Sequence, residues 1–201
     1  MLPSVEARWF MQGIVPVKAL EWIERWELPP TTPDEREDHY LSLPDTAVIG
    51  VKLRERKLEV KRLDIDLGLV ALGSRVVGRL ALWRKWSFKV AEGDGDKAPD
   101  REWITVGKKR YLCKYSRSVS GLTPVDPKSF PIRGCTLELT SLKIKGAEWW
   151  TVGFEAFGPD EDELRNTLVL VGERCFSPGG HPSLDVANSC DYPEWLASIS
   201  E

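Results

Sequence analysis

The stretch VIGVKLRERKLEVK, residues 48–61, decides the fold class. In its first half Ile49, Val51 and Leu53 alternate with small or charged residues, which is typical of a strand with one apolar face. From Leu58 onward the apolar residues fall at even positions instead. One unbroken strand cannot change faces, because its side-chain period is two. The stretch therefore predicts a β-hairpin.

A turn at Arg56 and Lys57 restores the phase of the two strands. It sets Leu53 opposite Val60, Arg54 opposite Glu59, and Lys52 opposite Lys61. The charged side chains of both strands then share one face, and we take that face as the candidate binding site.

The rest of the chain predicts more strands and a few helices. In a first strand at residues 5–11, Val5, Ala7 and Trp9 alternate against Glu6, Arg8 and Phe10. A helix opens at Pro16 and ends before Pro29-Pro30. Further strands are expected at residues 39–43, 78–90, 102–115, 134–144 and 148–157. An acidic loop is expected at 92–100, an irregular connection at 116–131, an acidic helix start at 160–163 and a tail helix near 193–199.

This pattern predicts an α+β protein that is mainly antiparallel β. We expect an eight-stranded closed or nearly closed barrel, a tunnel, with flanking helices. The 201 residues suit a single domain, 1–201, in which 177–201 form a C-terminal tail or short helix.

Composition excludes several functional classes. A net charge of −3 argues against general nucleic-acid binding, which requires a basic surface. Four scattered cysteines and two histidines argue against a structural zinc site. The start of the chain lacks the pattern of a secretion signal, and no apolar run is long enough to cross a membrane. We therefore expect a cytoplasmic protein with free thiols and no membrane partner.

Alternation places many charged residues on strands rather than in loops. On an open sheet they would form the solvated face. In a closed barrel they would point inward, where cations without partners are costly to bury. Such a cavity would need an anion with several charges or a matching set of carboxylates. The residues are Arg8, Lys52, Arg54, Lys61, Arg79, Lys85, Lys108 and Arg110, with Glu6, Glu59, Glu138 and Glu155.

These residue types suit a phosphorylated ligand. The planar fork of arginine binds two phosphate oxygens, and lysine adds positive charge. Carboxylates beside phosphate would repel it unless a divalent ion such as Mg²⁺ bridges the two. Such an ion would neutralise charge and position an attacking water.

The order of these features resembles the CYTH-like family, the triphosphate tunnel metalloenzyme superfamily. The resemblance runs from about Val5 to Phe176. It consists of an opening strand with Glu6, the hairpin with Lys52-Leu53-Arg54 and Leu58-Glu59-Val60-Lys61, the basic strand Lys108-Lys109-Arg110, Glu138 within residues 136–139, and Glu155 within residues 150–158.

The resemblance implies an eight-stranded antiparallel tunnel and hydrolysis or transfer of phosphate from inorganic triphosphate, thiamine triphosphate or nucleotides, with Mg²⁺ or Mn²⁺. It implies phosphate binding by Lys52, Arg54, Lys61, Lys108 and Arg110, to which we add Lys85 from the strand pattern, and metal binding by Glu6, Glu138 and Glu155. Glu59 is expected as a charge partner.

The chain departs from the family at its opening signature, Glu-x-Glu-x-Lys, which here has Arg8 and Phe10 at its second and third positions. Phe157 also occupies a position on the late strand at which members of the family often have a second carboxylate residue. These changes should weaken binding of a divalent ion. Three functions stay open: a metal-dependent triphosphatase, a non-catalytic binder or sensor of a phosphorylated metabolite or polyphosphate, and an interaction module without ligand.

Overall fold

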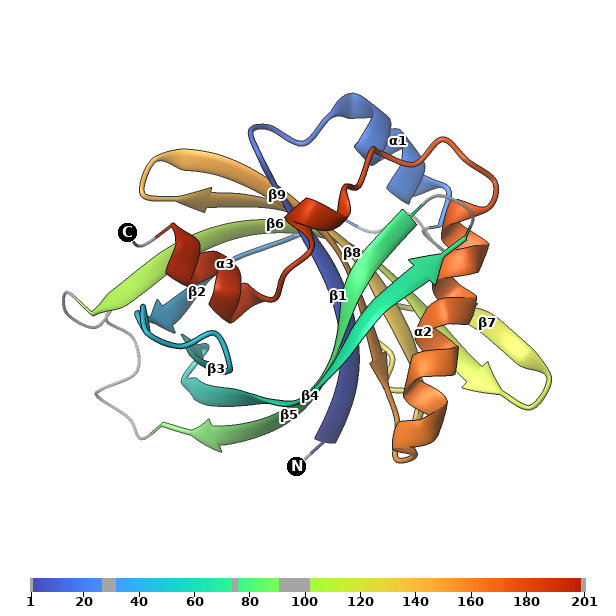
Figure 1. Cartoon of the computed structure of the whole chain (residues 1–201), viewed down its shortest axis with the longest axis horizontal. Helices are drawn as coiled ribbons and strands as arrows, with labels where there is room; N and C mark the ends of the chain where they lie inside the picture. Colours follow the sequence, from blue (N-terminus) through green and yellow to red (C-terminus); the bar gives the residue numbers. More distant parts are fainter. Residues whose placement is uncertain (1, 27–31, 74–75, 91–101, 200–201) are drawn as a thin grey trace.

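The computed structural model describes residues 2–26, 32–73, 76–90 and 102–199. Its strands form one antiparallel sheet in the order β2-β3-β4-β5-β1-β9-β8-β6-β7, and β2 also pairs with β6. That pairing closes eight strands into a barrel, which confirms the predicted architecture (Figure 1). The strands are β1 (Leu2–Gln12), β2 (Asp34–Leu41), β3 (Ile49–Arg54), β4 (Lys57–Leu72), β5 (Val76–Lys89), β6 (Trp103–Ser118), β7 (Gly121–Val125), β8 (Gly134–Ile144) and β9 (Ala147–Phe157).

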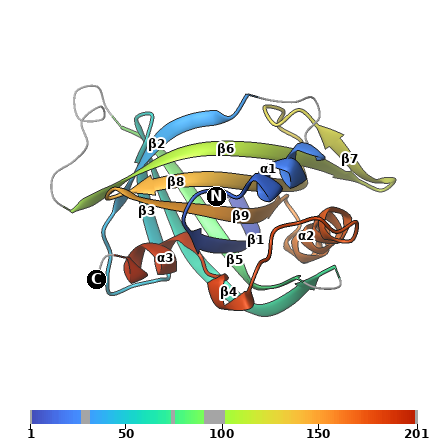
Figure 2. The same ribbon diagram turned by 90° about the horizontal axis from the view of Figure 1, so that it is seen from above.

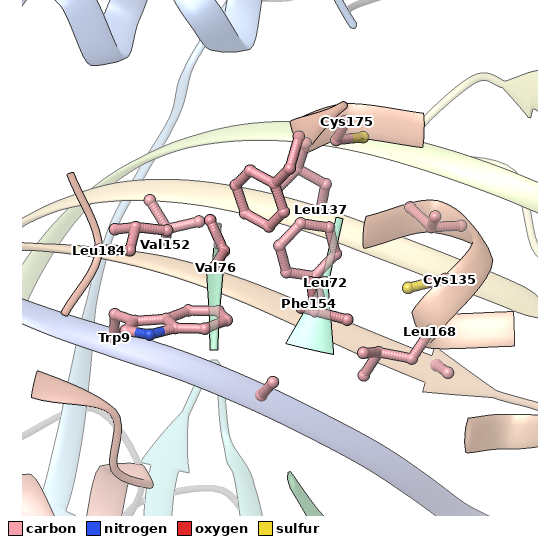
Figure 3. Close-up of a cluster of buried hydrophobic side chains, with 14 of the residues drawn as sticks. Trp9, Leu72, Val76, Cys135, Leu137, Val152, Phe154, Leu168, Cys175 and Leu184 are labelled. Atoms are coloured by element: carbon pink, nitrogen blue, oxygen red, sulfur yellow. The ribbon is translucent and has the colours of Figure 1, made fainter. Parts of the chain in front are cut away.

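The main hydrophobic core lies outside the barrel, between its wall and two helices. Helix α1 (Val17–Glu24) and helix α2 (Glu161–Phe176) cover the apolar outer face. Trp9 is fully buried there, and Trp22 stacks on Phe176 with ring centroids 5.5 Å apart. Figure 3 shows Trp9 and Phe154 of the wall beside Leu168 and Cys175 of α2. Because the apolar side chains of the wall face outward, the alternate positions are left for the interior of the barrel.

A second, smaller core closes one end of the barrel. The short helix α3 (Tyr192–Ser198) follows the 3₁₀ turn η1 (Val186–Asn188). Trp195 of α3 stacks on Phe10 of β1, with ring centroids 4.5 Å apart. Figures 1 and 2 both show α3 on the far side of the barrel from α2.

The structure corrects the predicted hairpin register. The turn lies at Glu55 and Arg56, which adopt left-handed φ angles of 46° and 58°. Lys52 consequently pairs with Glu59, and Leu53 pairs with Leu58. The shift of two residues keeps each side chain on its predicted face, but it replaces a lysine–lysine pair by a lysine–glutamate pair. The prediction erred because neither residue carries the usual turn signal of Asn or Gly.

Four other expectations need correction or lie outside the described residues. The connection at 116–131 is not wholly irregular, because β7 forms a hairpin with β6. The strand expected at 39–43 is β2, which begins at Asp34. The acidic loop expected at 92–100 falls outside the described residues. Pro29 and Pro30 do so too, but α1 already ends at Glu24, so the helix is shorter than expected. None of the helices in the described part of the chain has the length and apolar character needed to cross a lipid bilayer.

Candidate functional site

The interior of the barrel holds a charged cavity of about 140 Å³, here called the charged chamber. Each of the eight barrel strands contributes at least one charged side chain to it, because every strand turns alternate residues inward. Two residues of the α3 segment complete the wall. The chamber is lined by Glu6, Arg8, Arg36, Tyr40, Gly50, Lys52, Glu59, Lys61, Lys85, Lys108, Arg110, Glu138, Glu155, Tyr192 and Pro193.

Most of the predicted site residues meet in this chamber. Five predicted phosphate-binding residues line it, namely Lys52, Lys61, Lys85, Lys108 and Arg110. The predicted metal ligands Glu6, Glu138 and Glu155 line it too, as does the predicted charge partner Glu59. Arg54 does not line it. Arg54 lies beside the hairpin turn, with Nη2 3.9 Å from Glu59 Oε1.

Glu138 is held between two arginines. Arg8 Nη1 lies 2.8 Å from its Oε1, and Arg110 donates to its Oε2 from Nε at 2.8 Å and from Nη2 at 2.5 Å. Burial alone would raise the pKa of Glu138, but Arg110 and Arg8 outweigh burial and hold that pKa well below its ordinary value. Glu138 is therefore ionised and fully engaged by cations.

Gly153 makes the Arg8 contact geometrically possible. In the sheet it lies directly between Arg8 of β1 and Glu138 of β8. A Cβ atom at position 153 would lie 2.5 Å from Arg8 Cζ. The guanidinium of Arg8 therefore packs directly on the backbone of β9 at Gly153 and reaches Glu138 on the neighbouring strand.

A second group of charges surrounds Asp38 and Glu59. The fully buried Asp38 contacts Lys108 at 2.9 Å, Arg36 at 3.2 Å and Lys52 at 3.7 Å. Lys52 Nζ also lies 2.7 Å from Glu59 Oε2. Burial nevertheless lowers the pKa of both Lys52 and Lys108 to about 8, because desolvation of each ammonium outweighs its carboxylate partners. An anion placed beside these lysines would restore the stability of their charged forms.

Glu6 and Glu155 face each other across β1 and β9. Lys61 forms an ion pair with Glu6, and although burial opposes it, the pKa of Glu6 falls. Glu155 has no ion pair with any side chain in the described ranges, and burial together with the charge of Glu6 raises its pKa. Of the carboxylates in the chamber, Glu6 and Glu155 are therefore the pair with the least compensation of negative charge by cations.

Aromatic rings of β2 and α3 form the wall at the α3 end. Tyr40 and Tyr192 stack with centroids 5.5 Å apart, and Lys108 Nζ lies 4.2 Å from the centroid of the Tyr192 ring. The hydroxyl of Tyr192 is buried without a hydrogen-bond partner among the described residues. An exposed ion pair between Arg79 of β5 and Glu194, at 3.0 Å, also links α3 to the barrel wall.

The chamber carries an excess of positive charge. Seven lysines and arginines line it, against four carboxylates and Asp38 behind the wall. The protein as a whole is nevertheless acidic, with a net charge of −3. Positive charge concentrated in an enclosed space favours an anionic ligand.

Two of the three carboxylates predicted to bind a metal are already engaged by cationic side chains. Glu138 is occupied by Arg8 and Arg110, and Glu6 by Lys61. Across the described ranges, no group of three or more His, Cys, Asp or Glu side chains is arranged to hold a metal. Arg8 places a guanidinium beside the carboxylate that a metal would need.

Comparison with known proteins supports the fold and does not indicate a function. A solved structure of a conserved hypothetical protein from Pyrococcus furiosus is similar, with a TM-score of 0.50 and 14% sequence identity. The match covers 95% of this chain and 98% of that one. No protein-family model matches the chain, and no curated protein matches it.

Sequence reasoning missed four residues of the site. Arg36 and Asp38 lie in the part of β2 that precedes the strand expected at residues 39–43, and Tyr40 lies within that expected strand but was not predicted as a site residue. Tyr192 comes from the tail helix. The spacing of Arg36, Asp38 and Tyr40, every second residue, is the signal that could have revealed the strand.

Proposed function

We infer that the protein binds a small phosphorylated compound in the charged chamber and does so without a metal ion. The observation that carries this proposal is the convergence of seven cationic side chains, with Arg8 rather than a carboxylate beside Glu138. Arginine donates two hydrogen bonds at once to a phosphate group, and lysine adds a compact positive charge. The order of basic and acidic strands that resembles the triphosphate tunnel family supports the same ligand class.

Thermal unfolding tests the proposal. Tripolyphosphate, thiamine triphosphate and ATP are each added in the presence of EDTA. A ligand at about a hundred times its dissociation constant adds about 2.7 kcal/mol to the stability of the native state. For a chain of this size that should raise Tm by about 5–10 °C. An unchanged Tm with all three compounds would refute phosphate binding. The remaining hypothesis would then be an interaction module without a ligand.

A matched pair of variants locates the site. Lys85→Met removes a chamber lysine that is 45% exposed and whose partner Glu59 retains Lys52. Lys109→Met removes a lysine that is 48% exposed on the outer face of β6. We expect the first to reduce the ligand-induced shift and the second to leave it intact. Equal effects would place the ligand elsewhere.

Metal-dependent phosphohydrolysis is the second candidate. It is favoured by the facing carboxylates Glu6 and Glu155, whose mutual repulsion a divalent cation would relieve. Phosphate release from tripolyphosphate with Mg²⁺ or Mn²⁺, abolished by Glu155→Gln, would establish it. Release that is no faster than with Glu155→Gln would exclude it.

A further inference from the structure

Two further cavities lie beyond the charged chamber, at the end of the barrel opposite α3. The first, of about 120 Å³, shares Arg8, Arg110, Glu138 and Glu155 with the charged chamber. Glu138 and the two arginines that bind it therefore line both spaces. Thr136 and Glu155 continue from there into a third cavity at the barrel mouth.

This outer cavity, here called the vestibule, is large and mostly apolar. Its volume is about 480 Å³, and its walls include Phe130, Pro131, Ile132 and Phe157. Phe130 is 96% exposed and Ile132 is 81% exposed. Such exposure of neighbouring large apolar side chains at a cavity mouth is typical of a binding surface.

The connection that carries Phe130 is held in place by Lys114. The ammonium of Lys114 donates to the carbonyl oxygens of Pro127 at 2.5 Å and Ser129 at 2.8 Å, and it lies 5.7 Å from the centroid of the Phe130 ring. Asp126 also accepts from the backbone amide of Lys128 at 2.7 Å. The vestibule is thus formed in advance, and the charge of Lys114 is directed to the backbone rather than to a ligand.

Resting on the proposed function, we propose that the natural ligand is a phosphate ester with an apolar organic group. Its phosphoryl groups lie in the charged chamber, and its aromatic or alkyl group lies in the vestibule against Phe130 and Ile132. The two parts meet beside Glu155, which lines the charged chamber, the small cavity and the vestibule. An inorganic polyphosphate would leave these apolar walls in water, whereas an ester of this kind covers them.

Continuity of the cavities favours this occupant over a protein partner. Glu155 lines both the vestibule and the charged chamber, so a single small molecule can contact both. A second copy of the chain that packed on Phe130 would cover the apolar surface but would not fill the small cavity behind it.

The test compares inorganic pyrophosphate with its geranyl ester by isothermal titration calorimetry. We expect the ester to bind at least about tenfold more tightly, because it also buries apolar surface. Phe130→Ser should remove most of this advantage and leave the affinity for pyrophosphate unchanged. Val119→Ser is the control, because Val119 is equally exposed but lies on the β6–β7 turn, away from the vestibule.

The outcomes separate the two proposals. Failure of both ligands to bind would overturn the proposed function. Equal affinity for both ligands, unaffected by Phe130→Ser, would leave phosphate binding standing and overturn the role of the vestibule. The same would follow if Val119→Ser weakened the ester equally, or if size-exclusion chromatography showed a dimer that Phe130→Ser converts to a monomer.

Discussion

The guanidinium of Arg8 reaches Glu138 only because β9 carries no side chain at Gly153. Gly153→Ala would therefore displace Arg8 and remove one of the two cations that neutralise Glu138. Breaking a buried ion pair in this way costs about 3–5 kcal/mol. We expect urea denaturation to show a loss of this size. Gly107→Ala serves as the control, since a Cβ there meets nothing nearer than 3.7 Å, and a similar loss in both variants would contradict the explanation.

Replacing Arg8 by glutamate tests what that residue does to metal binding. Arg8→Glu sets a new carboxylate beside Glu138 and Glu6, where mutual repulsion should destabilise the protein. Mn²⁺ should then restore Tm, because carboxylate oxygens would surround the ion, while the wild-type Tm should not respond to Mn²⁺. Thermal unfolding with and without Mn²⁺ measures both responses. A wild-type protein that Mn²⁺ stabilises as strongly would show that Arg8 does not block a metal.

Affinity for a phosphorylated ligand should fall as the pH rises through about 8. Lys52 and Lys108 have pKa values lowered to about 8, so both lose their charge there. Between about pH 7 and pH 10 we expect Kd, measured by calorimetry with tripolyphosphate, to rise at least about tenfold.

Stability should respond to the same two lysines in the opposite sense. The pKa values of Lys52 and Lys108 are lower in the folded protein than in the unfolded chain. Between about pH 8 and the ordinary lysine pKa the unfolded chain therefore binds more protons. The contribution of the two lysines to the free energy of unfolding consequently rises with pH over this range. Lys52→Met should weaken both pH dependences. A Kd that is constant over this range would contradict the role of the lysines.

At the scale of elements, α3 is the part that completes the chamber. Trp195 is buried on Phe10 and keeps Tyr192 against Lys108. Trp195→Ala should cost about 3–5 kcal/mol by urea denaturation and should also weaken tripolyphosphate binding. Ser198→Ala, at an exposed position of the same helix, should leave ligand affinity unchanged. Loss of stability without loss of affinity would mean that α3 supports the fold only.

The elements also show how far sequence reasoning reaches. The faces of β1, β3, β4 and β8 followed from alternation, because a period of two survives errors at strand ends. The hairpin register did not follow, because Glu55 and Arg56 adopt left-handed conformations that their residue types do not signal. Arg36 and Asp38 escaped detection because a strand buried by ion pairs lacks the apolar pattern on which prediction depends. The position of α3 over the barrel end is set by tertiary contacts, which no local sequence pattern signals.

For the whole molecule, the important property is the separation of charge. Positive side chains gather inside a protein whose net charge is −3. Their mutual repulsion should make the native state respond specifically to a multivalent anion. We expect sodium phosphate to raise Tm above that in sodium chloride of the same ionic strength, and Lys85→Met to reduce the difference. Identical Tm values in both salts would contradict an anion-binding interior.

The place of β1 within the barrel has a consequence for biosynthesis. This first strand pairs on one side with β5 and on the other with β9, which begins only at Ala147. At ordinary translation rates the ribosome needs on the order of ten seconds to deliver β9 after β1 has emerged. Throughout that interval the nascent chain exposes an unpaired strand edge. Chaperone protection during synthesis, rather than stability of the finished barrel, should therefore limit the yield of native protein.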